Sequence, residues 1–346
     1  MKVGHLYSQI ISLENLFQAW DEFKKGKSDK RDVQLFEKDM EDNLFSVREQ
    51  LKNKTYKHSP YMAFNIYDPK FRHIHKATVL DRIVHHAVVS VIGPIFDKSF
   101  IFDSYSCRKN KGMHRAVKRL AEFTGKESRN YTSNCYILKL DIKKFFASVD
   151  HQILLSILRN KFEDEDLMWL LSNIVNSFYS DIGFGKGIPI GNLTSQIFAN
   201  IYLNELDKFI KQELKIMYYI RYADDFVIIS NDKEYLDGLI IKINRFLGVT
   251  LKLTLHENKI LIRKLRQGID FLGYIVLPHY TLPRTKTIKR MFKKLDEKFN
   301  SPKRSQSLQS YLGYLSHANA YNLAQQLKNQ LWYNLPYALE NSAQKK

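Results

Sequence analysis

The residues best suited to chemistry are two adjacent carboxylates, Asp224 and Asp225, which stand between two apolar runs. The runs, 218–220 and 226–229, predict a strand, a tight turn and a second strand. Adjacent like charges repel, and removing a carboxylate from water is costly unless it gains a partner. A divalent cation would satisfy both carboxylates. The pattern therefore predicts a metal-dependent catalyst that has a further carboxylate elsewhere in the chain.

Asp141 is the candidate for that carboxylate, because it directly follows the apolar run 136–140. Mg²⁺ prefers oxygen ligands and usually takes one or two carboxylates together with substrate phosphates. Two such ions can activate a 3′-hydroxyl and stabilise a leaving pyrophosphate during an in-line displacement. A single Asp after a strand is most often a turn or cap residue, and Asp150 is predicted to cap the helix that follows it. The combination of Asp141 with Asp224 and Asp225 in one basic chain favours a metal site over turn residues alone.

Charge and cysteine content narrow the classes of partner and cofactor. The 346 residues include 54 Lys and Arg against 36 Asp and Glu, which gives a net charge of +18 and a pI near 9.6. Such an excess favours a polyanionic partner, most often nucleic acid, over a merely solvated basic surface. Cys107 and Cys135 lie outside any Cys/His cluster, so we expect neither a zinc site nor a disulfide framework, and we expect Cys107 and His114 to be packing residues. The sequence shows no signal peptide and no long uncharged apolar run, which predicts a cytoplasmic protein without a membrane segment.

Hydrophobic periodicity predicts a mixed α+β chain in three segments. Residues 1–60 are predicted to form two helices, the first capped by Ser12 and the second over 32–52. Residues 61–278 combine helices and strands, and 279–346 are predicted to be a basic helical module without strands, because twelve Lys and Arg stand against three Asp and Glu from residue 280 onward. The elements expected within 61–278 are short strands in 61–75, helices at 79–98, 151–178 and 233–247, a helix capped by Asn192 or Thr194, and strands at 136–140, 251–255 and 269–276.

The order of these motifs resembles that of reverse transcriptases over roughly residues 60–330. The resemblance implies an α+β right-hand polymerase fold. Residues 1–60 would extend the fingers, 61–278 would form the fingers and a palm with an antiparallel sheet, and 279–346 would form a helical thumb and a short tail. The matching segments, in chain order, are Arg72, Asp81-Arg82, 105–112, 141–146, 187–196, 222–225, Lys259 and 271–274.

The resemblance also assigns roles to individual residues of an RNA-directed DNA polymerase. Asp141 and Asp224 would bind two catalytic Mg²⁺ ions, for which Mn²⁺ could substitute, with the Ile142 carbonyl as a further ligand and Asp225 in support. Lys259 would donate a proton to pyrophosphate. The residues implied to contact the dNTP are Arg72, Lys70, Lys76, Ile142, Phe146, Ile190, Gly191 and Gln196, with Phe146 as a steric gate against a 2′-hydroxyl. The implied primer grip is Phe271, Leu272, Gly273 and Tyr274.

The loop at Ile190 separates classes within this family. Bacterial intron and retron relatives usually have Gln-Gly followed by Ser-Pro at this point, whereas this chain has Ile190-Gly191 followed by Ser195-Gln196. The pairing resembles reverse transcriptases of diversity-generating retroelements, in which copying of template adenines is error-prone. We therefore expect an error-prone enzyme whose fidelity depends on Ile190.

The expected partners are template RNA, primer, cDNA and dNTPs, and the retroelement resemblance adds a small basic accessory protein and a structured non-coding RNA. We expect the chain to be bacterial or phage-encoded and to carry no ribonuclease H, integrase or endonuclease domain after the thumb. Two other functions stay open: an antiphage-defence (antiviral) reverse transcriptase that copies a dedicated non-coding RNA, and a non-catalytic nucleic-acid-binding scaffold. The carboxylates Asp141, Asp224 and Asp225 argue against the scaffold, and Phe146 argues against an RNA polymerase.

Overall fold

The computed structural model describes residues 4–67, 70–299 and 301–332, which contain both helices and strands. This content confirms the predicted α+β class. The chain divides into two compact units. The first contains the chain up to Asn110 together with Leu140–Phe226 and Gly238–Ile260, and the second contains Lys111–Lys139, Val227–Asp237 and the chain from Leu261 onward. The predicted segment boundaries at residues 60 and 278 remain predictions.

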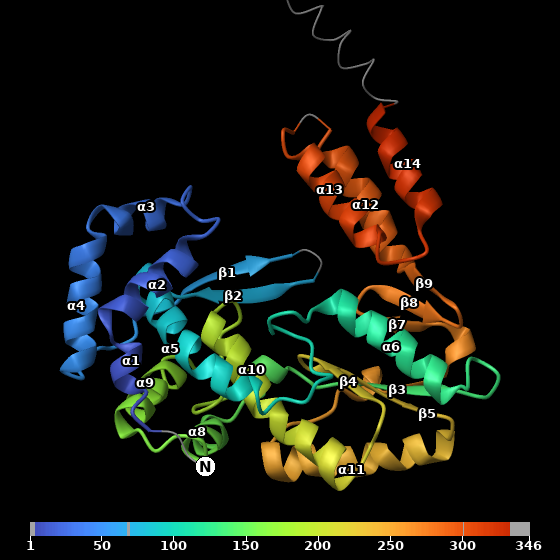
Figure 1. The fold of residues 1–346 in the computed structure, drawn as a ribbon, viewed down its shortest axis with the longest axis horizontal. Helices are drawn as coiled ribbons and strands as arrows, with labels where there is room; N and C mark the ends of the chain where they lie inside the picture. The colour runs from blue at the N-terminus through green and yellow to red at the C-terminus, as the bar shows by residue number, and fades with distance from the viewer. Residues whose placement is uncertain (1–3, 68–69, 300, 333–346) are drawn as a thin grey trace, which may run out of the picture. The chain divides into compact units, whose positions relative to one another are not determined.

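Helices make up most of the first unit. They are α1 (Tyr7–Ile10), α2 (Leu13–Lys24), α3 (Arg31–Lys38), α4 (Met40–Lys52), α5 (Val79–Asp97), α7 (Phe145–Ser148), α8 (His151–Arg159), α9 (Glu165–Val175), α10 (Leu193–Lys208) and the π-helix η1 (Phe209–Glu213); α11 (Lys233–Leu251) begins in the second unit and ends in the first. Ser12 caps α2 as predicted, because its Oγ accepts a hydrogen bond from the Asn15 N–H at 3.2 Å. Helix α5 packs against α2 and α10 and so forms the centre of this unit (Figure 1).

Helix α5 is long and apolar enough to cross a membrane by length and composition, although it contains the charged residues Asp81 and Arg82. However, 56% of its apolar window is buried inside the protein, where Val84, Ala87 and Val88 are fully buried. A core helix satisfies the same criterion as a membrane span, so this helix is weak evidence for a membrane segment.

Two of the predicted helices are interrupted in the structure. The helix expected over 32–52 is divided into α3 and α4 at Asp39, whose φ of −119° and ψ of 36° are not helical. The helix expected over 151–178 is divided into α8 and α9, because the Asp164 carboxylate accepts from the Leu167 N–H at 3.0 Å and begins a new helix. Asp150 caps α8 as predicted, by accepting from the Ile153 N–H at 3.1 Å.

The described strands form a hairpin and two larger sheets. The hairpin joins β1 (Met62–Ile66) and β2 (Arg72–Lys76) antiparallel, with Ile66 opposite Arg72. The strand, turn and strand predicted around the paired carboxylates are present as β4 (Tyr219–Tyr222) and β5 (Asp225–Ser230). The other strands are β3 (Tyr136–Asp141), β6 (Leu261–Lys264), β7 (Ile269–Phe271), β8 (Tyr274–Leu277) and β9 (Tyr280–Pro283), and the sheet orders are β4-β5-β3-β6 and β7-β8-β9.

Three strand predictions are wrong. The single strand expected at 269–276 is two strands, β7 and β8, separated by a turn at Leu272 and Gly273. Residues 251–255 do not form a strand, because α11 continues through Leu251 and Leu255 makes only an isolated bridge with Ile142. The segment after residue 280 is not free of strands, because β9 pairs antiparallel with β8, with Leu277 opposite Tyr280. The β8–β9 hairpin, which precedes the helices, was missed because the segment after residue 280 was interpreted from its basic composition.

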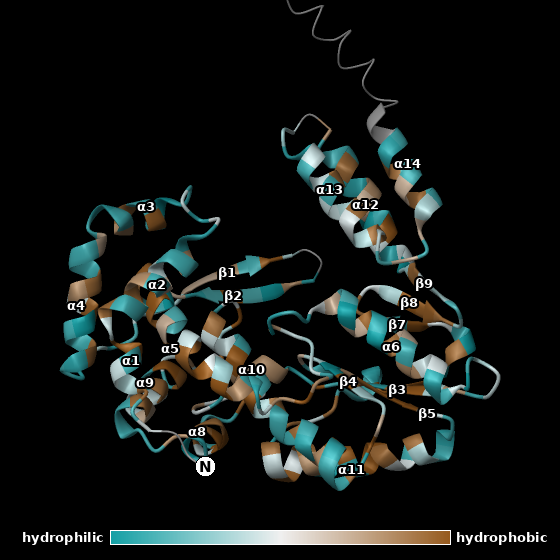
Figure 2. Cartoon of the chain, in the orientation of Figure 1, coloured by the Kyte–Doolittle hydropathy of each residue, from teal (hydrophilic) through white to brown (hydrophobic). Residues whose placement is uncertain are grey.

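The second unit ends in three helices around a small apolar core. Its helices are α6 (Met113–Glu127), the 3₁₀ helix η3 (Leu265–Gln267), α12 (Thr285–Glu297), α13 (Arg304–Leu315) and α14 (Tyr321–Trp332). Figure 2 shows hydrophobic and hydrophilic residues interleaved along α12. The buried side chains of this core are Met291, Leu295, Leu308, Leu315, Ala320 and Leu327. Lys286, Lys289 and Lys293 lie exposed at helical spacing on α12, so this helix presents a basic stripe to solvent.

Two histidines of the first unit are buried against one another. The Nε2 atoms of His58 and His85 lie 3.1 Å apart, and the two rings are stacked. Burial lowers the pKa of His58 and brings the pKa of His85 well below its usual value. Burial, reinforced by the charge of Lys27, also lowers the pKa of His86 to about 4. The fold therefore accommodates these imidazoles in their neutral form.

Acidification from about pH 7.5 to about pH 5 is expected to lower the free energy of unfolding. Histidines with lowered folded pKa values stabilise the fold fully above the unfolded pKa near 6.5, and this contribution is lost as the pH falls toward the folded values. The slope is roughly 1.4 kcal/mol per pH unit for each proton that only the unfolded chain binds. Urea titrations across this range measure it. His85→Leu should flatten the profile and His279→Gln, at an exposed position, should not; equal profiles would contradict the assignment.

Candidate catalytic site

Asp141 lies at the end of β3, where backbone contacts fix its position. Its carbonyl oxygen accepts a hydrogen bond from the His256 N–H at 2.8 Å, and Ile142 forms an antiparallel bridge with Leu255. The chain then enters the 3₁₀ helix η2 (Glu257–Lys259). This pairing returns Lys259 to the neighbourhood of Asp141.

Lys259 makes a direct ion pair with Asp141. Its Nζ lies 2.9 Å from each of the two carboxylate oxygens, so the ammonium group bridges them. The Lys259 side chain is 44% exposed and the Asp141 side chain 18% exposed. The lysine head group can therefore leave the carboxylate for water, because no burial holds it in place.

Asp224 lies in the turn between β4 and β5, within electrostatic reach of Asp141. Burial raises the pKa of Asp224, and the charge of Asp141 raises it further, against the opposing effects of Lys259 and Lys70. The preceding residue, Ala223, has a φ of +54°, in the left-handed region that non-glycine residues rarely adopt. A tight turn thus holds a carboxylate where its negative charge is disfavoured without a nearby cation.

These donors fit a divalent cation. Asp141 and Asp224 offer carboxylate oxygens, and the backbone carbonyl of Ile142 adjoins them in the chain, which is the donor type that hard cations prefer. Lys259 already places a positive charge against Asp141. Within the described residues, no group of three or more His, Cys, Asp or Glu side chains is placed to hold a metal ion. Asp225 is therefore not gathered with the other two carboxylates into a three-residue ligand set.

The glycine-containing loop after α9 is tied by its backbone to the chain that follows Asp141. The Ile188 N–H donates to the Phe146 carbonyl and the Gly187 N–H to the Val149 carbonyl, both at 2.8 Å. Gly187 has a φ of +101°, and a Cβ there would lie 2.7 Å from the Cβ of Ser180, so only glycine fits. These contacts leave the Phe146 ring half-buried beside the loop.

The hairpin β1–β2 is joined to the same loop. The His75 N–H donates to the Ile190 carbonyl at 3.1 Å. Asn192 completes the joint, because its Nδ2 donates to the His75 carbonyl at 2.7 Å and its Oδ1 accepts from the Ala77 N–H at 3.3 Å. Asn192 stands at the N-cap position of α10, but its side chain makes no capping hydrogen bond, unlike the prediction. The side chain joins two segments instead.

The four charged or polar residues predicted to contact the dNTP occupy different environments. Lys70 and Arg72 are exposed on the hairpin, and the Lys70 charge acts on the Asp224 carboxyl. Lys76 forms an ion pair at 2.7 Å with Asp32 of α3, and this contact is separate from Asp141 and Asp224. Gln196 is exposed in the first turn of α10.

The predicted primer grip lies in the second unit, at the turn between β7 and β8. Leu272 and Gly273 both have positive φ, of 49° and 90°. The Gly273 carbonyl accepts from the Tyr314 hydroxyl at 2.6 Å and from the Arg284 N–H at 2.9 Å. The Tyr274 hydroxyl in turn donates to the Tyr314 carbonyl at 2.8 Å. Tyr314 on α13 therefore fixes this turn from both sides.

His114 supports the same turn. Its Nδ1 lies 2.9 Å from the Tyr274 hydroxyl, and its ring stacks on His317 with centroids 3.8 Å apart. The interpretation of His114 as a packing residue is consistent with these contacts, whereas Cys107, given the same role, is exposed. The sequence did not predict the hydrogen bonds that connect His114 of α6 and Tyr314 of α13 to this turn.

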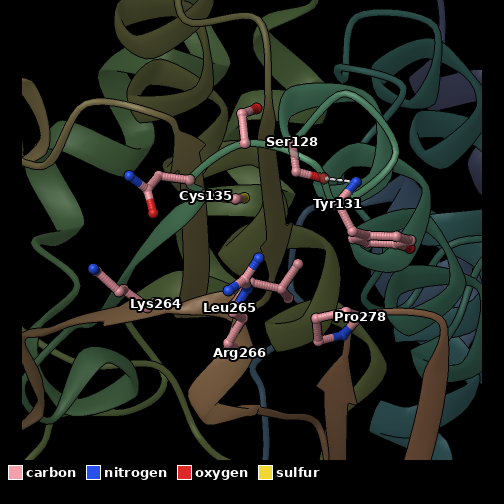
Figure 3. Close-up of a pocket in the computed structure, with 9 residues that line it drawn as sticks. Ser128, Tyr131, Cys135, Lys264, Leu265, Arg266 and Pro278 are labelled. Atoms are coloured by element: carbon pink, nitrogen blue, oxygen red, sulfur yellow. Dashed lines mark hydrogen bonds between the residues drawn. The ribbon is translucent and has the colours of Figure 1, made fainter.

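A small hollow in the second unit contains no second reactive centre. Figure 3 shows Ser128 and Tyr131 on one side and Lys264, Leu265 and Arg266 on the other. Cys135 lines the hollow, but burial and the charge of Glu127 raise the pKa of its thiol to about 12. The thiol therefore stays protonated and is a poor nucleophile.

The sequence interpretation also missed a buried ion pair beside the carboxylate turn. Arg221 on β4 and Asp207 on α10 are both fully buried and bonded to each other. Charged residues inside an apolar strand and an apolar helix face were the available signal, since such residues are rarely buried without a partner. The two were not connected because nothing in the sequence states which charges meet.

Comparison with known proteins places this arrangement in a family. The family model for reverse transcriptase (RNA-dependent DNA polymerase) matches residues 56–276, more than half of the chain. Protein YkfC of Escherichia coli (strain K12) is 25% identical over 269 residues, which cover 66% of this chain and 69% of that protein. The group II intron-encoded protein LtrA of Lactococcus lactis subsp. cremoris is 25% identical over 319 residues, 72% of this chain and 51% of LtrA. The chain thus spans about half the length of LtrA.

A shorter relative and a solved structure agree. The retron Ec73 reverse transcriptase of Escherichia coli is 33% identical over 115 residues, 30% of this chain and 34% of that protein. Telomerase from Candida albicans matches with a TM-score of 0.50 at 12% identity, over 76% of this chain and 56% of that one, a likeness of fold alone. The predicted right-hand polymerase fold is confirmed. With the family pattern matched across 56–276, and with group II intron and retron proteins as relatives, the chain belongs to the reverse transcriptase (RNA-dependent DNA polymerase) family.

Proposed function

We propose that this protein is an RNA-templated DNA polymerase that makes cDNA by two-metal nucleotidyl transfer, with Mg²⁺ as the ion and Mn²⁺ able to substitute. The observation that carries the proposal is the pair of carboxylates Asp141 and Asp224, electrostatically coupled within one compact unit. Two divalent ions would supply activation of the primer 3′-hydroxyl and neutralisation of the developing phosphate charge. Side chains of the protein would supply proton donation, sugar selection and phosphate binding.

Lys259 has two properties that suit a proton donor to pyrophosphate. Its ammonium group is positioned by η2 next to the carboxylates, and its half-exposed side chain can swing toward an anionic leaving group. Phe146 offers a half-buried ring, fixed through its backbone to the loop, as a wall against a 2′-hydroxyl. Lys286, Lys289 and Lys293 of α12 offer sequence-independent contacts to duplex phosphates.

Primer extension tests this function directly. The full chain is incubated with an RNA template, an annealed DNA primer, Mg²⁺ and either dNTPs or rNTPs. We expect extension with dNTPs, little with rNTPs, and restored rNTP use in Phe146→Val. Absence of template-dependent extension with either ion would overturn the polymerase assignment.

Within the family, we infer a role in a diversity-generating retroelement, with error-prone copying of adenines. The inference rests on Ile190 and Gln196, at the positions where the family resemblance implies that intron and retron relatives usually have Gln and Pro. The Ile190 carbonyl is bonded to the His75 N–H of the hairpin, while the side chain is half-buried and carries no amide. An aliphatic side chain can enforce shape but offers no hydrogen bond to a nucleotide, so discrimination is lower.

Ile190→Gln is expected to lower misincorporation opposite template adenine by about 10-fold, with a smaller change at other template bases. One hydrogen bond to a polar partner is worth about 1.4 kcal/mol, or tenfold in discrimination. Sequencing of cDNA made on a defined RNA measures the error spectrum. Ile190→Val, which keeps a branched aliphatic side chain, is the matched control and should retain the adenine errors. An unchanged spectrum in Ile190→Gln would count against the role of this position.

A second candidate function is reverse transcription of a dedicated non-coding RNA in antiphage defence. It rests on the resemblance of the polymerase motifs to those of bacterial reverse transcriptases, of which the retron Ec73 reverse transcriptase, 33% identical over 115 residues, is one. Purification from the native bacterial or phage-infected host, followed by sequencing of bound RNA and cDNA, separates the two roles. Adenine-mutated cDNA of a coding template supports the retroelement, and an unmutated copy of one structured RNA supports defence. We place either activity in the cytoplasm, and a co-purifying small basic protein would identify the expected accessory partner.

A further inference from the structure

The buried ion pair between Arg221 and Asp207 lies directly before the catalytic turn. Both residues are 0% exposed and meet through two parallel contacts, Nε to Oδ1 at 2.8 Å and Nη2 to Oδ2 at 2.6 Å. The hydroxyl of Tyr219, itself fully buried, donates to the same Oδ1 at 2.8 Å. The guanidinium group is thus fixed in its plane, with one nitrogen left for other partners.

That remaining nitrogen reaches the turn. Arg221 Nη1 donates to the Ala223 carbonyl at 3.3 Å and to the Asn200 Oδ1 at 3.1 Å. Ala223 has the left-handed φ of +54° and immediately precedes Asp224. A non-glycine residue remains in this region only where its surroundings enforce it. The contact from Arg221 is such an enforcement, because it fixes the orientation of the peptide that leads into Asp224.

The backbone of Arg221 is fixed as firmly as its side chain. Its N–H donates to the Asp103 carbonyl at 3.0 Å, and its carbonyl accepts from the Tyr105 N–H at 2.9 Å. Asn200 extends the connection, since its Nδ2 donates to the Ser106 carbonyl at 2.9 Å. The arginine therefore connects the turn to the segment 103–106 and to helix α10.

Stability alone does not account for this arrangement. A buried ion pair is often no more stabilising than apolar residues of the same volume, because both charges lose their hydration. Arginine, unlike lysine, has a planar fork that can satisfy a carboxylate with two nitrogens while a third points elsewhere. In this protein the third nitrogen, Nη1 of Arg221, points to the Ala223 carbonyl.

We propose that Arg221 is a positioning residue for catalysis: anchored by Asp207, it holds the Ala223 carbonyl and so aims the Asp224 carboxylate toward Asp141. The rate readout of this proposal rests on the polymerase function proposed above, whereas its ion-binding readout does not. The substrate contacts themselves lie elsewhere, so the arginine acts through the turn.

Arg221→Lys tests the proposal with the buried charge retained. An ammonium group can still pair with Asp207 but cannot also reach Asn200 and Ala223 in the same geometry. We expect kcat for primer extension to fall about 10-fold with KM for primer–template unchanged, and the Mn²⁺ dissociation constant, read by electron paramagnetic resonance of the free ion, to rise about 5-fold. Tyr219→Phe is the control: it removes one bond to Asp207 but leaves the Arg221–Ala223 contact, so its melting temperature should fall while kcat and Mn²⁺ affinity stay at wild-type values.

The variant Arg221→Met/Asp207→Leu/Tyr219→Phe separates positioning from folding. It removes every polar group of the cluster on these three residues and leaves no unpaired buried charge, so it is expected to fold. A structural role predicts normal kcat and Mn²⁺ affinity in this variant, and a positioning role predicts that both are impaired at least as much as in Arg221→Lys. If this variant fails to fold, Arg221→Lys, which keeps the charge pair, still decides.

The outcomes distinguish this proposal from the polymerase function. If the wild-type chain extends no primer, the polymerase function fails, and the Mn²⁺ comparison alone decides the role of Arg221. If the wild-type chain is active and Arg221→Lys matches it in kcat and Mn²⁺ affinity, the positioning role is overturned. The positioning role is supported if kcat and Mn²⁺ affinity are impaired in Arg221→Lys and in the triple variant but stay at wild-type values in Tyr219→Phe.

Discussion

Asp224→Asn is expected to reduce primer extension by at least about 10³-fold and, at the same time, to make the metal-free protein harder to unfold. A carboxamide is a weak ligand for hard divalent cations, and the loss corresponds to about 4 kcal/mol of transition-state stabilisation. The gain in stability follows from the site itself. Asp224 carries a charge that burial and Asp141 both disfavour, and the amide removes it. Functional sites commonly sacrifice stability in this way.

The pH dependence of that gain gives a second readout. The pKa of Asp224 is raised in the fold, so its carboxyl contributes stability below the unfolded pKa near 3.9 and loses it as the pH rises through the folded value. The advantage of Asp224→Asn, about 1 kcal/mol in urea titrations with a chelator, should therefore be present at neutral pH and vanish in acid.

Asp150→Asn is the matched control for the loss of a carboxylate. Asp150 caps α8 and pairs with Lys252 at 2.9 Å, outside the proposed site. We expect a loss of about 1 kcal/mol of stability with primer extension near the wild-type rate. Wild-type activity in Asp224→Asn, or a comparable loss of activity in Asp150→Asn, would remove the distinction between the two residues.

Gly273→Ala is expected to destabilise the second unit by about 3 kcal/mol and to weaken primer–template binding about 10-fold. Gly273 has a φ of +90°, and an added Cβ would lie 2.8 Å from the Tyr314 hydroxyl. The methyl group would therefore strain the turn and displace the hydroxyl from the Gly273 carbonyl. Denaturant titration and fluorescence anisotropy with a labelled primer–template measure the two effects.

Two further variants isolate the cause. Tyr314→Phe removes the hydroxyl that meets the added Cβ, so Gly273→Ala should cost less in the Tyr314→Phe background than in the wild type. Gly313→Ala is the control, because a Cβ at that position in α13 meets nothing within 4 Å. Alanine there should stabilise the helix by about 0.5–1 kcal/mol. Additive effects of Gly273→Ala and Tyr314→Phe would show that the two groups do not interact.

The sequence predicted those features that depend on local pattern. Alternation of apolar runs with turn residues located the β4–β5 hairpin and the strand that ends at Asp141, and capping chemistry located Ser12 and Asp150. The break at Asp39 was missed because the apolar periodicity continues across it. The break at Asp164 was missed although four consecutive acidic residues, 163–166, interrupt the apolar pattern there. The strand expected at 251–255 was wrong because alternating leucines can be buried without forming a strand, as Leu253 and Leu255 are after the end of α11.

The connections between distant residues could not be predicted. The pairing of Arg221 with Asp207, of Lys259 with Asp141 and of Lys76 with Asp32 depends on which elements meet in three dimensions. Composition shows that these charges exist, and only for the fully buried Arg221 and Asp207 does burial itself require a partner. Only the fold selects the partner, and for Lys76 that partner is Asp32 of α3.

The joint between the hairpin and the loop has a consequence for how this enzyme could diversify. The joint uses the carbonyl of Ile190, the backbone of His75 and the side chain of Asn192. The side chain at position 190 takes no part in these hydrogen bonds, so mutation can exchange it while the mechanical connection persists. Under the fidelity role proposed for Ile190, copying accuracy can then be retuned by exchange of this one residue, without rebuilding the scaffold on which polymerisation depends.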